Sequence, residues 1–353
     1  MIYSLAVALQ ELKSLWGSIS GQINLLSLGG CGLKPKFSTF LLKAFAWIIL
    51  VTGWSFVPFA KGQGIQLELR ELAEDVYVMQ HPTGSSNSVF VVTEEGVVVF
   101  DSDIRTADQV FTAIRRTTDL PIRYLIISHP AGDHSTGAWH FREDKPTIIA
   151  SRIQAMSIAE EEMVEFQSRR DSGDPIYQPY QNTEFVQPDI LFDEKVTLRF
   201  GELTFEITEE GSEHSTSDVS LYIPEKRIFT MGDLFKSEIH TGPGDTAYDN
   251  FAAGSGWIEV IDNIIGREQE VDTYVPGHGV VHVGRGIADL TELRSYFVAM
   301  RAEVLDMITQ GKSEEEVLAE FLTPAAFSHY EQADRLTTFL PLYYQQLQAE
   351  AGH

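Results

Sequence analysis

The sequence predicts an α+β fold that is followed by a helical C-terminal extension. Short runs rich in valine, isoleucine and phenylalanine, bounded by turn residues, recur from Gln66 to Val275 and are typical of β-strands. Three segments with helical spacing of apolar residues separate groups of these runs, at 106–118, 153–170 and 257–265. Beyond Ala288 the strand-like runs stop, and helical spacing continues to about Ala349.

The composition is that of a globular protein with a strongly acidic body. The chain has 353 residues, of which 43% are hydrophobic and 22% are charged. Acidic residues outnumber basic ones 51 to 26, and beyond residue 60 the imbalance is 50 to 22, a net charge of −28. Such a surface repels phosphate backbones, so we expect no nucleic-acid partner.

Residues 1–62 differ from the body and are expected to form a leader. Lys34 and Lys36 precede an apolar run at 37–60, in which the last 17 residues carry no charge. A basic flank before an apolar segment is typical of an export signal or a single membrane anchor. We therefore expect the protein to be exported to the periplasm or the outside of the cell, or anchored to the membrane by residues 37–60. The alternative is a buried helix of the folded body.

The first half of the body predicts four strands, a helix and a further strand. A hairpin turn at Glu94–Gly96 joins the third strand to the fourth. The helix at 106–118 has Val110 and Ile114 on one side. The expected strands lie at 67–69, 76–79, 88–92, 97–100 and 122–127.

The second half repeats this order in outline, and a helical tail follows it. We expect a strand at 147–150, a helix at 153–170 and a polar loop at 171–184. In the tail, Ser313 followed by three glutamates is typical of a capped helix start. We expect this tail to pack on the body. The further strands are predicted at 190–192, 196–200, 203–207, 219–223, 227–231 and 273–275.

A cluster of metal-ligand residue types follows the strand at 122–127. His129, Asp133 and His134 lie within six residues, and imidazole together with carboxylate is the ligand set of a zinc-type site. Ala131 stands between them, where a second histidine would be expected. The only cysteine of the chain is Cys31, so the body has no thiolate ligand and the chain forms no internal disulfide.

Three more candidate ligands also follow predicted strands. His214, Asp233 and His278 each lie close to a glycine just after a strand. Glycine allows the tight turns that let such side chains meet. We therefore expect the strand-end loops to converge on one site.

These residues resemble the metallo-β-lactamase superfamily in order and spacing. The matching positions cover roughly residues 66–285 and are Asp101, His129-Pro130-Ala131-Gly132-Asp133-His134, His214-Ser215, Gly232-Asp233 and Gly277-His278. The resemblance implies an αββα sandwich with a metal site at one edge. The expected organisation is then a leader at 1–62, a metallo-β-lactamase-like domain at 63–287 and a helical extension at 288–353.

The resemblance also implies how the ligands are shared between two metal positions. The first position uses His129, residue 131 and His214. The second uses Asp133, His134 and His278, with Asp233 bridging the two. Because Ala131 removes a ligand from the first position only, we expect one firmly held zinc and a possible second one.

Three other residues bear on the same site. His140 or His240 is an alternative source of the missing ligand. The resemblance gives Asp101 a supporting role, in which it holds the histidine loop.

The function implied is a zinc-dependent hydrolase of a small-molecule ester, thioester, lactone, amide or phosphoester. Zinc makes hydroxide available at neutral pH, and Asp133 or Asp233 would orient or deprotonate the water. Two alternatives of the same fold remain: a periplasmic β-lactamase, and a catalytically weak or inactive metal-binding accessory protein. An iron-dependent redox relative is a further alternative.

Overall fold

The computed structural model describes residues 65–244 and 252–351. The expected leader, with its export signal or membrane anchor, lies outside these residues. Within the described ranges, every helix is too short or too polar to cross a bilayer. Residues Gln63–His353 group into one compact unit, so the predicted boundary at 287/288 falls inside this unit and stays a prediction.

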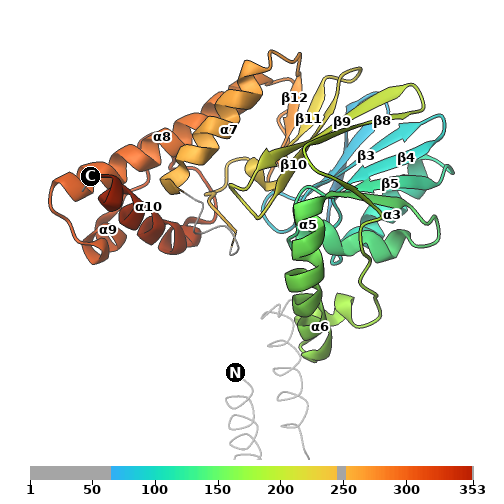
Figure 1. The fold of residues 1–353 in the computed structure, drawn as a ribbon, viewed down its shortest axis with the longest axis horizontal. Helices are drawn as coiled ribbons and strands as arrows, with labels where there is room; N and C mark the ends of the chain where they lie inside the picture. The colour runs from blue at the N-terminus through green and yellow to red at the C-terminus, as the bar shows by residue number, and fades with distance from the viewer. Residues whose placement is uncertain (1–64, 245–251, 352–353) are drawn as a thin grey trace, which may run out of the picture. The chain divides into compact units, whose positions relative to one another are not determined.

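The first of two sheets has seven strands, which follow one another in space as they do in sequence (Figure 1). The first four strands pair antiparallel, and parallel pairing begins between the fourth and the fifth. The strands are β1 Glu68–Ala73, β2 Val76–Gln80, β3 Ser88–Thr93, β4 Gly96–Phe100, β5 Ile122–Ile126, β6 Thr147–Ser151 and β7 Ile190–Phe192.

The second sheet has five strands in the order β12-β11-β10-β9-β8. Its strands pair antiparallel except for β11 and β12, which are parallel and run from Ile228 opposite Thr273 to Thr230 opposite Val275. The strands are β8 Lys195–Phe200, β9 Leu203–Gly211, β10 Asp218–Ile223, β11 Ile228–Thr230 and β12 Thr273–Val275.

The two sheets face each other across a hydrophobic core, as strand β4 shows. Successive side chains of a strand point to opposite faces. Val98 and Phe100 enter the core between the sheets, where they meet Phe205 of β9. Val97 and Val99 enter a second core on the outer face of the first sheet. Because both faces of β4 are covered, this strand reads as an unbroken apolar run.

Helices cover both outer faces, which confirms the predicted αββα sandwich. Helix α3 (Ala107–Thr117) packs on the first sheet through Val110 and Ile114. Helices α7 (Ser255–Gly266) and α8 (Ile287–Thr309) share a core with Tyr222, Phe229 and Tyr274 of the second sheet.

The C-terminal helices join this last core and do not stand apart from it. Tyr343 and Leu347 of α10 (Leu336–Ala351) are buried in the same cluster as Trp257 of α7. Ser313 and Glu316 form the predicted capping box of α9 (Glu314–Glu320). Two 3₁₀ helices, η7 (Ala325–Phe327) and η8 (Ala333–Arg335), connect α9 to α10.

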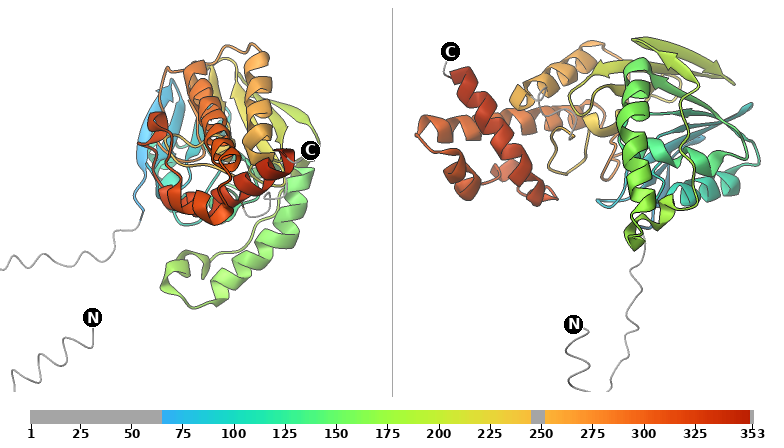
Figure 2. Two further views of the ribbon diagram at one scale, coloured as in Figure 1. Left: turned by 90° about the vertical axis from the view of Figure 1, so that its left-hand side faces the viewer. Right: turned by 60° about the horizontal axis from the view of Figure 1, so that its bottom comes forward.

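The segment between β6 and β7 forms a helical arm, defined here as residues 152–180, which extends from the sandwich in both views of Figure 2. It begins with α5 (Arg152–Ser157), the π-helical turn η2 (Ile158–Glu162) and α6 (Met163–Asp171). Part of the expected loop at 171–184 is a 3₁₀ helix, η3 (Pro175–Tyr180). A proline-containing stretch has weak helical periodicity, so sequence pattern alone did not indicate it.

His240 is buried in the C-terminal core, where it limits stability in acid. Its Nδ1 lies 3.1 Å from the Tyr296 hydroxyl, and its ring contacts Tyr330. Burial lowers the pKa of His240 from 6.5 to about 4. The unfolded chain therefore binds a proton at higher pH than the folded chain, so folding stability falls as pH drops from about 6.5 towards 4.

We expect His240→Gln to remove part of this acid sensitivity. Between pH 7 and pH 5 the free energy of unfolding of the wild type should fall by about 2 kcal/mol more than that of the variant. Urea unfolding at both pH values measures this difference. The exposed His329→Gln is the control and should behave as the wild type does. An equal pH dependence in all three proteins would contradict the assignment.

Candidate metal centre

The candidate ligands gather where strands of both sheets end. His129 lies just beyond β5, and the short helix α4 (Gly132–Ser135) carries Asp133 and His134. From the second sheet, His214 follows β9, and His278 follows β12. Asp233 lies in the 3₁₀ turn η4 (Gly232–Leu234), directly after β11.

A glycine permits the close contact between the last two of these loops. A Cβ atom on Gly277 would lie 2.3 Å from Oδ1 of Asp233 and 2.5 Å from the backbone carbon of Gly232. Both distances are far below van der Waals contact, so only glycine fits at 277. The His278 loop can therefore lie directly against the turn that carries Asp233.

The four candidate ligands of the second metal position bring donor atoms close to one another. The Nε2 atoms of His134 and His278 are 3.3 Å apart. Oδ1 of Asp233 lies 3.3 Å from the first of these nitrogens and 3.4 Å from the second. Oδ2 of Asp133 lies 3.2 Å from the nitrogen of His278 and 3.8 Å from that of His134.

These separations fit a tetrahedral zinc ion. Ligands 2.0–2.1 Å from zinc lie about 3.3 Å from one another at the corners of a tetrahedron. Moreover, Oδ1 of Asp233 is buried and makes no hydrogen bond with any described residue. Buried polar atoms normally have a partner, so this set of donors is suited to a metal ion.

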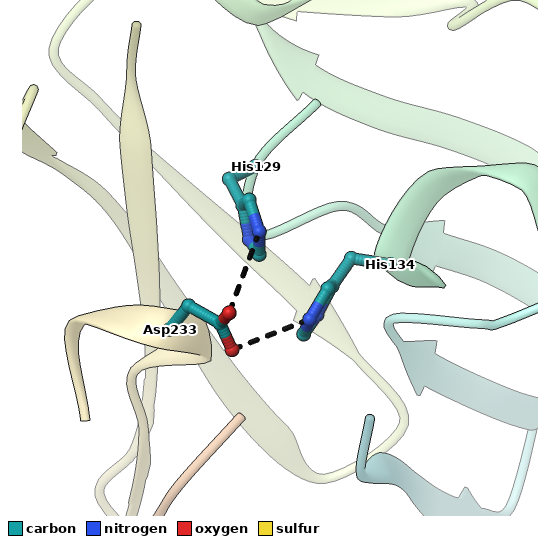
Figure 3. A group of neighbouring side chains, drawn as sticks. All are labelled: His129, His134 and Asp233. Carbon is teal, nitrogen blue, oxygen red and sulfur yellow. Dashed lines mark ion pairs between the residues drawn. The ribbon is translucent and has the colours of Figure 1, made fainter. Parts of the chain in front are cut away.

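The first metal position has fewer donors, and they meet the other oxygen of Asp233. Oδ2 lies 3.1 Å from Nε2 of His214 and 3.9 Å from Nε2 of His129. Figure 3 shows the two oxygens of Asp233, one directed to His129 and the other to His134. Ala131 has no side chain that could bind a metal. Lys236, a residue that sequence reasoning missed, brings Nζ to 2.7 Å from the same Oδ2 atom of Asp233.

Partners behind the histidines fix their orientation. Oδ2 of Asp101 lies 2.8 Å from Nδ1 of His134, and its Oδ1 accepts a hydrogen bond from the backbone N–H of Ser128. Nδ1 of His214 lies 3.1 Å from the carbonyl oxygen of Gly242. A proton on each Nδ1 satisfies these contacts and leaves Nε2 free to bind a metal.

Two more residues support the loops. The side-chain amide of Asn87 donates to the carbonyl oxygens of Pro276 and Gly279, and so it holds the loop of His278. Asp218 accepts from the backbone N–H groups of His214 and Ser215. Sequence reasoning gave neither residue a role at the site, because nothing in the local pattern reveals which distant loop a polar side chain will reach.

The two alternative histidines do not supply the missing ligand. His240 is directed into the C-terminal core, towards Tyr296. The charged neighbours of His140 are Asp108 and Arg142. His140 is not among the residues that form groups of possible metal ligands in the described part of the chain. Both residues therefore lie away from the centre.

The protonation states of the donors differ, and a metal ion must displace a proton from His134. Burial works to lower the pKa of His134, but the carboxylates of Asp233 and Asp133 hold it well above its usual value. Burial and the neighbouring His134 hold the pKa of His129 well below its usual value, so this imidazole is neutral. Burial works to raise the pKa of Asp233, but the positive charges of His278 and Lys236 hold it well below its usual range. Neutral imidazole and ionised carboxylate are the forms that bind metals.

A cavity of about 490 Å³ opens beside the centre, between the metal loops and the helical arm. Asp133 lines it together with His129, Ala131 and His214, so three candidate ligands are accessible from this side. The arm contributes the opposite wall. Its charged and aromatic lining residues are Glu161, Glu162, Glu165, Arg169, Tyr177 and Tyr180.

Asp101→Asn tests the support behind His134. The amide cannot replace both oxygens as acceptors, so His134 loses its fixed orientation. We expect the affinity for zinc to fall 10–100-fold, the usual cost of losing such a partner. Competition with a chromogenic chelator measures this loss. Asp289→Asn, which also changes a buried carboxylate but lies in α8, is the control and should keep wild-type affinity.

Comparisons with known proteins agree with this arrangement. The model of the metallo-beta-lactamase superfamily matches residues 81–278, a range that includes all six candidate ligands. A metallo-beta-lactamase type 2 of Bacillus cereus is 22% identical over 202 residues, which are 56% of this chain and 68% of that protein. The alpha subunit of a 2,4-dinitroanisole O-demethylase of Nocardioides sp. is 27% identical over 158 residues, or 45% of this chain and 40% of that one.

Solved structures share the fold at low sequence identity. A stereoselective inverting sec-alkylsulfatase from Pseudomonas sp. superposes with a TM-score of 0.62 at 16% identity, over 79% of this chain and 50% of that one. A metallo-beta-lactamase from Pontibacter korlensis superposes with a TM-score of 0.52 at 19% identity, over 66% of this chain and 99% of that one. The present chain thus spans about half the length of the alkylsulfatase it resembles.

Proposed function

The chain belongs to the metallo-beta-lactamase superfamily of metal-dependent hydrolases, and we propose that it is a zinc-dependent hydrolase of polar small-molecule esters or of related thioesters, lactones, amides or phosphoesters. The observation that carries this proposal is the cluster of donor atoms from Asp133, His134, Asp233 and His278, which lie 3.2–3.8 Å from one another in the measured pairs. This set lies beside a cavity large enough for a small substrate.

Bound zinc would lower the pKa of water to about 7 and would polarise an oxygen of the substrate. The residues around the ion would have different roles. His134 and Asp233 are buried and His278 is partly buried, and these three residues would hold the ion. Asp133 is the carboxylate of the centre that reaches the cavity, and its side chain is 30% exposed against 5% for Asp233.

Asp133 is therefore placed to orient the attacking water by a hydrogen bond. His129 and His214 lie on the same wall of the cavity, where their neutral rings can hold the water or the substrate. These two histidines remain useful in this way even though the first metal position lacks a third histidine.

The charges around the cavity bear on the class of substrate. Arg105 is paired with Asp103, and Arg169 with Glu165, so both guanidinium groups already have carboxylate partners. Glu162 is buried, and burial raises its pKa to about 8, so it is protonated at neutral pH and can donate a hydrogen bond. This lining favours a polar, weakly charged substrate over a polyanion.

Asp133→Ala tests the proposal directly. The change removes a ligand and the residue placed to orient water, so bound zinc should fall from about one equivalent and hydrolysis should drop at least a hundredfold. Mass spectrometry measures the metal, and a panel of a carboxylic ester, a thioester, a lactone, a β-lactam, a phosphodiester and a secondary alkyl sulfate measures turnover.

The exposed Asp119→Ala makes the same change of charge away from the centre and should behave as the wild type does. A folded wild-type protein that takes up no zinc would contradict the proposal.

Ala131 favours one second candidate function, a metal-binding accessory protein with little or no turnover. It predicts the same zinc content as the hydrolase. The two differ in the panel, because an accessory protein would hydrolyse none of its substrates in the wild type as well as in Asp133→Ala.

We also propose that the protein is exported or membrane-anchored, because the apolar run at 37–60 follows Lys34 and Lys36. Sequencing the N-terminus of the mature protein and fractionating the cells test this. We expect either an N-terminus near residue 60 or an intact chain in the membrane fraction. An intact chain in the cytosol would contradict it.

A further inference from the structure

We propose that Lys236 takes the place of the first metal ion as the partner of Asp233, so that the centre is built for a single ion at the second position. This inference rests on the proposed function, because it concerns how the same centre binds metal. Lys236 is then a positioning residue that acts on the ion through Asp233.

The contacts of Asp233 divide cleanly between its two oxygens. Oδ1 faces Nε2 of His134 and of His278, at 3.3 and 3.4 Å. Oδ2 faces Nε2 of His214 at 3.1 Å and Nζ of Lys236 at 2.7 Å. The amine therefore occupies the side of the carboxylate on which a first ion would bind.

Lys236 is built into this position. Only 3% of the residue is exposed, and among the described residues Asp233 is its one ion-pair partner. Its backbone forms a parallel bridge with His278, and the backbone N–H of the next residue, Ser237, donates to the carbonyl oxygen of His278 at 3.0 Å. A buried amine needs a fixed polar partner, and here the fold provides Oδ2.

Ala131 is consistent with a centre that binds a single ion. Without a side-chain donor at 131, a first ion would have only His129, His214 and Oδ2 of Asp233 as ligands, and Nε2 of His129 is 3.9 Å from that oxygen. Two features therefore weaken the first position: residue 131 supplies no ligand, and an amine contacts the oxygen of Asp233 that would face a first ion.

The amine also has a consequence for the second position. By donating to Oδ2, Lys236 holds the carboxylate with Oδ1 directed at His134 and His278. The pairing therefore orients a ligand of the remaining ion, which is the role that supporting hydrogen bonds have at metal sites.

Zinc stoichiometry in two variants tests the proposal. The wild type, Ala131→His and the double variant Ala131→His/Lys236→Met are loaded with excess zinc, desalted and weighed by native mass spectrometry. We expect one equivalent in the wild type and still one in Ala131→His, because the amine blocks the restored ligand set. The double variant should hold two.

The outcomes separate this inference from the proposed function. Two equivalents in the wild type or in Ala131→His, or one in the double variant, would overturn the role of Lys236 and leave the hydrolase proposal standing. A wild type without any zinc would overturn both.

Lys236→Met by itself and Lys226→Met, a lysine outside the centre, serve as folding controls by circular dichroism. If the variants at 236 do not fold, Ala131→His alone decides. One equivalent supports the proposal, and two refute it.

Discussion

The carboxylate of Asp233 is the point on which the centre depends, because its two oxygens face two different sets of partners. Oδ1 completes the donors around His134 and His278, while Oδ2 is held by His214 and Lys236. A carboxylate with 5% exposure is costly to bury unless positive or hydrogen-bonding groups surround it. The contacts of Asp233 therefore stabilise the loops and position the donors of the metal site at the same time.

The sandwich makes these contacts possible by bringing strand ends together. Parallel pairing of β4 with β5 places Asp101 beside the loop that starts at Ser128. Parallel pairing of β11 with β12 places the Asp233 turn beside the His278 loop in the same way. The absence of a side chain at Gly277 then allows contact between the two loops. Parallel strand pairing and the absence of a Cβ atom at Gly277 thus determine how closely the ligand-bearing loops approach each other.

Much of the fold and of the candidate site could be predicted from the sequence, because these features produce recognisable local sequence patterns. Buried strands such as β4 leave unbroken apolar runs, and helix α3 leaves a one-sided apolar pattern, so both were correctly placed. The six candidate ligands stand beside glycines at strand ends, and the structure brings them together around Asp233. Whether they hold zinc, and which positions are filled, stays a prediction.

Features that depend on distant contacts left no such signal. Asn87 holds a loop 189 residues away, and its turn looks like any other polar turn. Lys236 lies in a segment with no distinguishing pattern. Because lysine is almost always exposed, the residue type by itself predicts a surface position. Its burial becomes meaningful only when the neighbouring Oδ2 is known.

Charge balance gives the asymmetry of the centre a physical rationale. Asp101, Asp133 and Asp233 contribute three negative charges when ionised. One divalent ion contributes two positive charges and Lys236 contributes a third when it is protonated, so a single ion then balances the three carboxylates. A second divalent ion beside the lysine would add two uncompensated charges in a poorly solvated site, which is strongly unfavourable. A centre with one ion needs no ligand at residue 131. The alanine at this position is therefore compatible with a functional one-metal site.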